Sequence, residues 1–342
     1  EADAVAADDE LSPAQMKNLS DALGVKVMDR TMIILDIFAR HAVTAEGKLQ
    51  VELAQLHYTQ AHLLGMRSSL SRLGGGVGTR GPGEQKLELD RRAIRARISF
   101  LREKLGELKR HREVARAQRE KSGSYIVALV GYTNAGKSTL LNRLTDAGIL
   151  AENKLFATLD PTTRKLALPG GEEVLLTDTV GFIRKLPHQL IEAFHSTLEE
   201  ARYADLILHV VDASSPEADT QMAVVYETLR ELEALEEHSI IAVYNKTDLP
   251  GAEILPKDIH ASASVRISAA TGEGLETLKE LISAEKKKSR RAFEGLFPYA
   301  AAGRIQSIRK QGKLLEERYE PEGIYVRAEV PNALYEQLTQ EK

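Results

Sequence analysis

The stretch that decides the fold runs Gly131-Tyr132-Thr133-Asn134-Ala135-Gly136-Lys137-Ser138, which reads G-x-x-x-x-G-K-S. It follows the apolar, β-rich run Tyr125–Val130 and precedes the helical run Ser138–Leu144. Strand, glycine loop and helix are the context in which this pattern forms a phosphate-binding loop. Gly131 and Gly136 let backbone N–H groups turn inward around phosphate oxygens, because glycine tolerates a positive φ.

The end of this loop suits contact with nucleotide phosphates and a metal ion. Lys137 is expected to reach the β- and γ-phosphates, and the Ser138 hydroxyl is expected to ligate Mg²⁺. The helix that begins at Lys137 adds free N–H groups and its positive dipole end. For this motif alone, an ordinary glycine turn before a helix is the alternative, since short patterns recur by accident.

Composition narrows the class of protein. The 342 residues suffice for two or more domains, and the net charge of −4 means that any affinity for nucleic acid must be local. There is no Cys, which excludes disulfides and thiolate chemistry and fits a reducing compartment. No apolar stretch reaches membrane-spanning length and no secretory signal is visible, so a cytoplasmic chain without a membrane span is expected.

The segment before the loop predicts a small, partial α/β piece and then an antiparallel helical hairpin. Leucine and isoleucine recur at steps of four and three from Leu49 to Leu70 and from Leu87 to Leu108, as in a coiled-coil seam. Six glycines between Gly74 and Gly83 interrupt the helices and form the expected tip. The second helix is basic on its outer faces. These faces fit either a solvated, salt-bridged helix or a local phosphate-binding surface.

From Ser124 to about Glu285, apolar strands alternate with helices, which predicts a doubly wound α/β domain. A basic linker is expected at 285–291. After it, we expect a strand from Gly303, a turn at 311–313, a strand at 325–330 and a helix at 333–339. The predicted organisation is an N-terminal domain at 1–122 (partial α/β piece 1–45, helical hairpin 46–121, glycine-rich tip 74–84), the doubly wound domain at 123–288, and a small α+β appendage at 289–342.

Two further motifs supply candidate metal and γ-phosphate contacts. Asp178-Thr179-Val180-Gly181 ends the third strand of the doubly wound domain, where Asp178 can hold Mg²⁺ through water and the Gly181 N–H can meet the γ-phosphate. Phe156-Ala157-Thr158-Leu159-Asp160 lies between the loop and Asp178, where Thr158 would complete the metal shell.

Two more motifs supply candidate contacts to the base. Asn245-Lys246-Thr247-Asp248 ends the fifth strand, and the Asp248 carboxylate can accept both N1–H and the N2 amino group of guanine. Adenine offers no such donor pair, so Asp248 favours GTP over ATP. Ser268-Ala269-Ala270-Thr271-Gly272 ends the sixth strand and would back the base with a main-chain N–H.

Together these motifs define a predicted site for GTP or GDP. The residues expected to bind nucleotide are Gly131, Tyr132, Thr133, Asn134, Ala135, Gly136, Lys137, Ser138, Thr139, Phe156, Ala157, Thr158, Leu159, Asp160, Asp178, Thr179, Val180, Gly181, Asn245, Lys246, Asp248, Ser268, Ala269 and Ala270. The expected catalytic residues are Lys137, Thr158 and Gly181. The expected metal ligands are Ser138, Thr158 and Asp178.

This ordered set is the G-domain signature of the Ras-like GTPases, and the chain further resembles the HflX family of ribosome-associated GTPases in the Obg–HflX superfamily. The resemblance covers most of residues 11–285. The runs that carry it are 29–39, 46–56, 80–84, 156–162 and 178–184. The family's N-terminal domain usually begins with more α/β structure, so we expect its first part to be missing here.

The resemblance implies a doubly wound Ras-like P-loop G domain that hydrolyses GTP with Mg²⁺, slowly until the ribosome stimulates it. It also implies a monomer that binds the large ribosomal subunit, its 23S rRNA and its proteins, but not DNA, and that promotes ribosome splitting under stress. Two alternatives are a nucleotide-gated RNA-binding or assembly module, and a scaffold that uses nucleotide as a folding ligand. Whether ATP is also used is left open.

Two positions bear on mechanism. In Ras-like enzymes a glutamine after the D-x-x-G glycine orients the attacking water, but this chain has Phe182 there, which cannot hold water. Asn134 fits two roles, a K⁺ ligand that stands in for an arginine finger or a residue that only stabilises the loop.

Overall fold

The computed structural model describes residues 2–70, 82–121, 123–145, 162–184, 200–235 and 238–340. Two compact units are present: one contains the chain up to residue 110, and the other contains the strands and helices from β3 to α10. Among the described helices, none is both long and apolar enough to cross a membrane.

The first unit begins with a small α/β piece. Its elements are β1 (Ala4–Ala6), α1 (Pro13–Leu23), β2 (Lys26–Met28) and α2 (Arg30–His41), and the two strands pair in parallel. Ser12 caps α1, because its Oγ accepts the Gln15 N–H and its own N–H reaches Oε1 of Gln15. Buried Asp29 caps α2 and also accepts the hydroxyl of Tyr58 at 3.0 Å, which ties this piece to the next helix.

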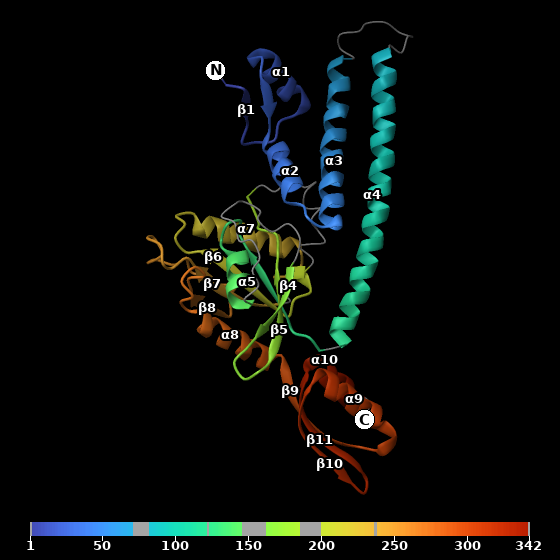
Figure 1. Ribbon diagram of the computed structural model, residues 1–342, viewed down its shortest axis with the longest axis vertical. Helices are drawn as coiled ribbons and strands as arrows, with labels where there is room; N and C mark the ends of the chain where they lie inside the picture. The colour runs from blue at the N-terminus through green and yellow to red at the C-terminus, as the bar shows by residue number, and fades with distance from the viewer. Residues whose placement is uncertain are drawn as a thin grey trace. The chain divides into compact units, whose positions relative to one another are not determined.

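The predicted helical hairpin follows as α3 (Ala45–Leu70) and α4 (Pro82–Lys121). Leu53 of α3 packs in one buried cluster with Ile98 and Leu101 of α4, as the predicted seam requires. Most of the predicted glycine-rich tip lies in 71–81, outside the described residues. Figure 1 shows the two helices lying side by side and running in opposite directions.

The second unit is built on a six-stranded sheet in the order β4-β5-β3-β6-β7-β8, in which only the β4–β5 pair is antiparallel. Its strands are β3 (Ile126–Gly131), β4 (Thr162–Ala167), β5 (Glu173–Asp178), β6 (Leu206–Asp212), β7 (Ser239–Asn245) and β8 (Ala263–Arg266). Its described helices are α5 (Lys137–Thr145), α7 (Ala218–Glu231) and α8 (Leu275–Lys288).

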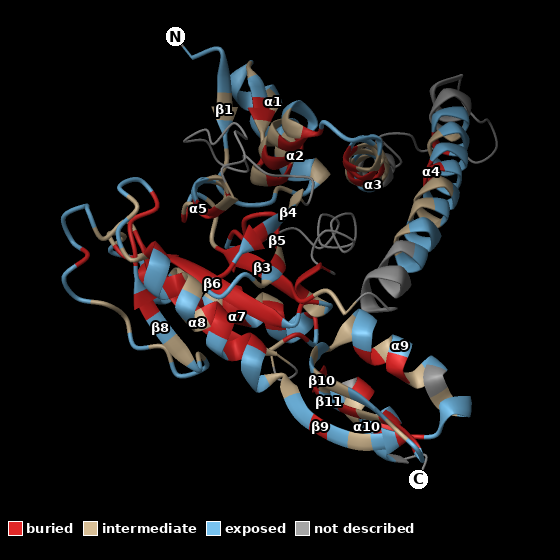
Figure 2. Ribbon diagram, turned by 60° about the horizontal axis from the view of Figure 1, so that its bottom comes forward, coloured by how far each residue is buried: buried red, intermediate tan, exposed pale blue. Residues whose placement is uncertain are grey.

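The central strands explain the continuous apolar runs in the sequence. All six residues of β3 and the first six of β6 are buried, because helices cover both faces of the sheet (Figure 2). Leu129 and Leu208 face a core shared with Leu140 of α5 and Leu278 of α8. This is the predicted doubly wound α/β fold, which the structure confirms.

The C-terminal elements differ from prediction in two places. They are β9 (Arg290–Phe297), a 3₁₀ turn (Tyr299–Ala301), α9 (Ala302–Gln311), β10 (Lys313–Glu320), β11 (Gly323–Pro331) and α10 (Asn332–Gln340). The strand predicted from Gly303 is wrong. This segment is α9, and its buried Ile305 and Ile308 follow the helical period. The linker predicted at 285–291 is also wrong, because it is the end of α8 and the start of β9.

The basic run at the end of α8 has a structural partner in the β4–β5 turn. Lys286 is 4% exposed, and its Nζ lies 2.9 Å from Oε2 of Glu172 and donates to the Glu173 carbonyl oxygen at 3.0 Å. Arg290 lies 3.6 Å from the other oxygen of Glu172. The hydrogen bond from Lys286 lowers the pKa of the Glu172 carboxyl. This ion cluster holds the β4–β5 turn against the chain that leads into β9.

Candidate functional site

The predicted motifs meet at one edge of the sheet. Gly131, Asp178 and Asn245 are the last residues of β3, β5 and β7, three strands that run in the same direction. Ser268 follows β8, the next strand across. Parallel strands place their carboxyl ends together, and this is where ligands bind in open α/β sheets.

The two loop glycines are required by space as well as by backbone angle. Gly131 has φ +156°, and a Cβ on it would lie 2.2 Å from the carbonyl oxygen of Val210 in β6. Gly136 has φ +96°, and a Cβ there would lie 2.2 Å from Nδ2 of Asn245. Asn134 has φ +62°, a conformation that Asn tolerates better than most residues. The loop therefore sits directly against β6 and β7.

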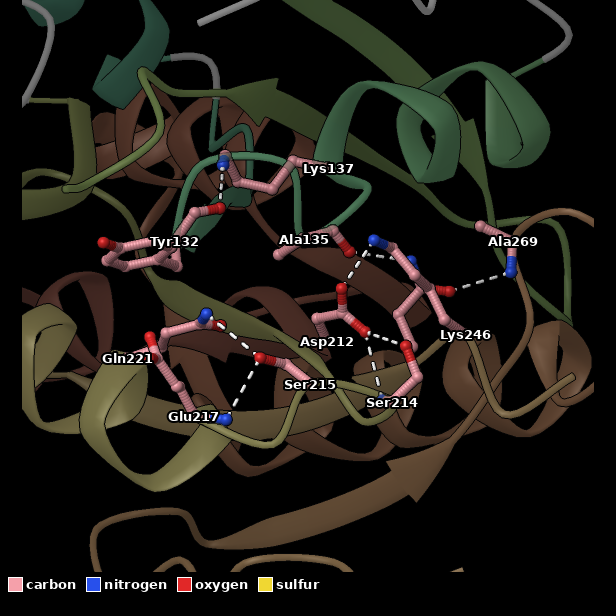
Figure 3. A network of polar contacts seen from close by, with 11 residues as sticks. Tyr132, Ala135, Lys137, Asp212, Ser214, Ser215, Glu217, Gln221, Lys246 and Ala269 are labelled. Carbon is pink, nitrogen blue, oxygen red and sulfur yellow. Dashed lines mark hydrogen bonds and ion pairs between the residues drawn. The ribbon is translucent and has the colours of Figure 1, made fainter. Parts of the chain in front are cut away.

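Lys137 is the charged group of this loop. Its side chain is buried, and its Nζ donates to the carbonyl oxygens of Gly131 and Tyr132, both at 3.0 Å. Figure 3 shows the bond to Tyr132. Burial lowers the pKa of the ammonium to about 8, although the Asp178 carboxylate opposes that shift. A buried ammonium beside the loop's N–H groups is suited to bind phosphate oxygens, because their negative charge would compensate the positive charge of the ammonium.

Oxygen donors fit for Mg²⁺ stand next to this lysine. The Ser138 hydroxyl donates to Oδ2 of buried Asp178 at 2.7 Å, so the two predicted ligands are in contact. The described residues contain no group of three or more His, Cys, Asp or Glu placed for a metal. Mg²⁺ takes few protein ligands and keeps phosphate and water oxygens, so this pair suits it. Thr158, with Phe156, Ala157, Leu159 and Asp160, lies outside the described residues.

The Gly181 turn is packed against the phosphate-binding loop. A Cβ on Gly181 would lie 2.8 Å from Cα of Thr133 and 3.1 Å from Nζ of Lys137. Phe182 exchanges backbone hydrogen bonds with this loop: its N–H reaches the Gly131 carbonyl at 3.1 Å, and its carbonyl accepts the Thr133 N–H at 2.8 Å. The Phe182 side chain is 3% exposed, so it cannot orient a water molecule.

Asn245 joins the phosphate-binding loop to the loop predicted to back the base. Its Nδ2 donates to the Ala135 carbonyl oxygen at 2.9 Å, and its Oδ1 accepts the Ala269 N–H at 2.9 Å. The residue is 2% exposed. Both ends of its amide are therefore used within the protein, a role that its motif alone does not reveal.

The residues predicted to face the base are placed around Asn245. Lys246 has φ +65°, and the nitrogen of its side chain reaches Asp212 (Figure 3). Asp248 is exposed at the start of the loop after β7. Ser268 is buried, and its hydroxyl accepts the Thr271 N–H at 3.1 Å, which closes the following turn.

Two residues that the motifs did not indicate also reach this site. Asp212 ends β6, and its Oδ2 lies 2.6 Å from Nζ of Lys246. Arg143 of α5 donates from Nη2 to the carbonyl oxygens of Ala270 and Thr271, both at 3.3 Å. Asp212 could have been found from sequence, because it follows an apolar strand just as Asp178 and Asn245 do. Arg143 carries no such signal.

The strand order, the glycine loop and the polar residues at the strand ends define a P-loop GTPase. A curated GTPase HflX from Lacrimispora saccharolytica is 62% identical over 99% of this chain and 80% of its own length, and another from Caldanaerobacter subterraneus is 54% identical over 99% and 78%. The chain therefore belongs to the HflX family of GTPases, and it binds and hydrolyses GTP. The predicted resemblance is confirmed.

Three family models and a further curated relative agree with this assignment. Family models match in three blocks: "GTP-binding GTPase N-terminal" at 1–39, "GTP-binding GTPase Middle Region" at 41–119 and "50S ribosome-binding GTPase" at 126–246. GTPase HflX of Escherichia coli K12 is 42% identical over 91% of this chain and 74% of its own length. A GTP-binding protein of Sulfolobus solfataricus, solved with GDP, covers 84% of this chain and 82% of its own, at 25% identity and a TM-score of 0.48. The family assignment rests on the sequence relatives.

Proposed function

We propose that this GTPase binds the large ribosomal subunit in its GTP form, promotes ribosome splitting under stress and uses hydrolysis to reset. The observation that carries the proposal is the match of the 50S ribosome-binding GTPase family to 126–246, the stretch that runs from the start of β3 to Lys246. We further assign residues 1–122 to the N-terminal domain, 123–288 to the G domain and 289–342 to the C-terminal domain.

In this proposal, one group of site residues binds the phosphates of the nucleotide and another group binds its base. The Gly131–Ser138 backbone and Lys137 hold the β- and γ-phosphates, and the Gly181 N–H meets the γ-phosphate. Ser138 and Thr158 would ligate Mg²⁺ and Asp178 would hold it through water, and the ion would neutralise charge on the phosphates. Asp248 selects guanine, with Ala269 and Ala270 behind the base. The remaining predicted contacts are Thr139, Phe156, Ala157, Leu159, Asp160, Thr179, Val180, Asn245, Lys246 and Ser268.

Light scattering of intact ribosomes tests the proposal. The GTP-loaded chain should lower the scattering. The chain with a non-hydrolysable GTP analogue should do the same, because in this proposal hydrolysis acts only after splitting, when it returns the protein to its GDP form. The GDP-loaded chain should leave it flat. A flat trace with GTP, alongside GTP-dependent co-sedimentation with 50S subunits, would favour a nucleotide-gated binding module that lacks splitting activity.

Arg80, in the predicted glycine-rich tip, separates ribosome binding from nucleotide chemistry. Arg80→Ala should weaken 50S binding and lower the log–log salt slope by about one unit for a lost phosphate contact. GTP affinity and basal turnover should not change. Arg40→Ala is the matched control, since it removes an exposed arginine that pairs with Asp36 on α2. If both variants bound like wild type, the tip would be only a connector.

A further inference from the structure

We propose that Asp212 is a positioning residue that holds Lys246 for the purine base and thereby sets how tightly GTP and GDP bind. The inference rests on the base site proposed above. It assigns a role in nucleotide affinity to a strand-end aspartate that belongs to none of the nucleotide-binding motifs.

Asp212 is bound on both of its carboxylate oxygens. Oδ2 pairs with Nζ of Lys246 at 2.6 Å, while Oδ1 accepts the Ser214 N–H at 3.1 Å and the Ser214 hydroxyl at 2.6 Å (Figure 3). The side chains of Asp212 and Lys246 are 18% and 23% exposed. Solvent and salt screen a half-buried pair of this kind less than a surface pair. Ser214 therefore orients the carboxylate, and the carboxylate orients the lysine.

The backbone around Lys246 is already fixed by its neighbours, so only the side chain of Lys246 remains free to change conformation. Lys246 itself has φ +65°, an uncommon conformation for a non-glycine residue that its surroundings must enforce. On one side, Asn245 is bonded to Ala135 and Ala269. On the other, Thr247 bonds through its N–H and its hydroxyl to the Ile267 carbonyl oxygen. A long lysine on this rigid turn would still sample many rotamers without Asp212.

The charge balance indicates that Asp212 affects the binding of GDP and GTP alike. Because Asp212 neutralises Lys246, this lysine adds little net attraction for phosphates, which meet Lys137 at the other end of the site. The expected effect is therefore the same for GDP and GTP. An affinity scales with the fraction of the protein in the binding-competent arrangement, so a Lys246 ordered one-tenth of the time would bind about tenfold more weakly.

The test uses the full chain and fluorescent GDP and GTP in stopped flow. Asp212→Asn should raise Kd for both nucleotides about tenfold, because only about one-tenth of the molecules would hold Lys246 in the binding-competent arrangement. KM for GTP should rise, while kcat at saturation stays within about twofold. Ser214→Ala removes one of the two bonds that orient the carboxylate, and it should raise Kd about two- to threefold. Asp219→Asn, an exposed charge change at the start of α7, is the matched control and should bind like wild type.

A double-mutant cycle shows whether Asp212 acts through Lys246. In a Lys246→Ala background, Asp212→Asn should have no further effect on Kd. Normal Kd for Asp212→Asn, or an undiminished loss in the Lys246→Ala background, would overturn the inference. So would a loss of affinity matched by an equal loss of nucleotide-free stability in urea, since that pattern marks a merely structural pair. If Lys246→Ala itself bound normally, the base site proposed above would be at fault instead.

Discussion

Nδ2 of Asn245 occupies the space that a side chain on Gly136 would need, since a Cβ there would lie 2.2 Å from that nitrogen. Gly136→Ala should therefore break the tie between the phosphate-binding loop and β7, and lower GDP affinity by about 100-fold or more, as expected when a buried hydrogen bond is lost and the loop is displaced. Titration with fluorescent GDP measures the loss.

Gly170→Ala is the matched control for this first prediction. Gly170, in the β4–β5 turn, has φ +93° against +96° for Gly136, and a Cβ added to it would have nothing within 4 Å. The control should cost about 1–3 kcal/mol of unfolding free energy from backbone strain, with normal GDP affinity. If the two variants bound GDP equally well, contact with Asn245 would not be what requires glycine at 136.

Nucleotide binding should be coupled to protonation of Lys137. Its pKa is about 8 in the nucleotide-free protein, so at pH 9 most molecules carry a neutral amine. Phosphate oxygens favour the charged form, so binding at pH 9 should take up close to one proton, and affinity should fall as pH rises above 8. Calorimetry in two buffers of different ionisation enthalpy measures the uptake. This uptake should be absent at pH 7, where Lys137 is already charged, and its absence at pH 9 would contradict the prediction.

Asp248 should determine base choice. Asp248→Asn should lose about 2–4 kcal/mol of GTP binding, because a bidentate, charge-assisted pair is lost. Affinity for xanthine nucleotides should rise, because xanthine presents an O2 acceptor where guanine has an amino donor. Competition titrations with GDP and XDP measure both changes. Glu253→Gln, in the same loop, should leave the preference as it is, and unchanged GTP affinity in Asp248→Asn would remove Asp248 from the site.

Glu172 and Glu173 are neighbours with different surroundings, which makes them a matched pair for stability. Glu172→Gln should lower the unfolding free energy by about 1–3 kcal/mol, discounted for partial exposure, since it leaves buried Lys286 without its carboxylate. Glu173→Gln breaks an exposed pair with Lys165 and should cost less than about 1 kcal/mol. Urea unfolding at pH 7 compares the two.

The pH dependence of this difference has a definite sign. Lys286 lowers the pKa of Glu172 in the folded chain, so its contribution is present above the unfolded pKa and is lost as pH falls through the folded pKa. Wild type and Glu172→Gln should therefore converge in acid. A difference between them that persisted well below pH 4 would point to packing instead of charge.

Turnover by the isolated chain should be slow in Na⁺ buffer, because buried Phe182 cannot position water, and it should rise with 50S subunits present. Exchanging Na⁺ for K⁺ distinguishes the two roles left open for Asn134. Asn134→Gly removes the side chain and tolerates φ +62°, so it adds no backbone strain. Loss of K⁺ stimulation with normal GDP affinity would identify an ion ligand, whereas weaker GDP binding would identify a loop stabiliser. Fast turnover of the wild type in Na⁺ would contradict the prediction.

The sequence predicted the second unit well because three of its motifs begin or lie at the last residue of a strand. Periodicity located the apolar strands, and parallel strands bring their carboxyl ends together, so Gly131, Asp178 and Asn245 could be placed at one edge from sequence alone. The helical hairpin can be predicted from sequence equally well, since apolar residues at steps of four and three define a seam without reference to distant residues.

What the sequence could not provide depends on contacts between distant segments. Lys286 reads as part of a basic linker until the β4–β5 turn supplies Glu172, and charge alone does not reveal that a lysine is buried. The segment that forms α9 does not show its helical period in the sequence, because the two isoleucines at 305 and 308 are too few to separate helix from strand. The two hydrogen bonds of Asn245 likewise need the loops at Ala135 and Ala269 to be in place.

The position of β3 also bears on the order in which the chain folds. β3 is the first strand of its sheet in sequence but lies between β5 and β6, and the N–H of Ile126 bonds to the Asp205 carboxylate 79 residues later. The seam between α3 and α4 closes over a shorter stretch of chain, with helices that form locally. Contacts of short sequence separation form faster. During synthesis, we therefore expect the hairpin to be assembled before β6, the second neighbour of β3, can pair with it. The phosphate-binding loop is then among the last parts of this fold to be completed.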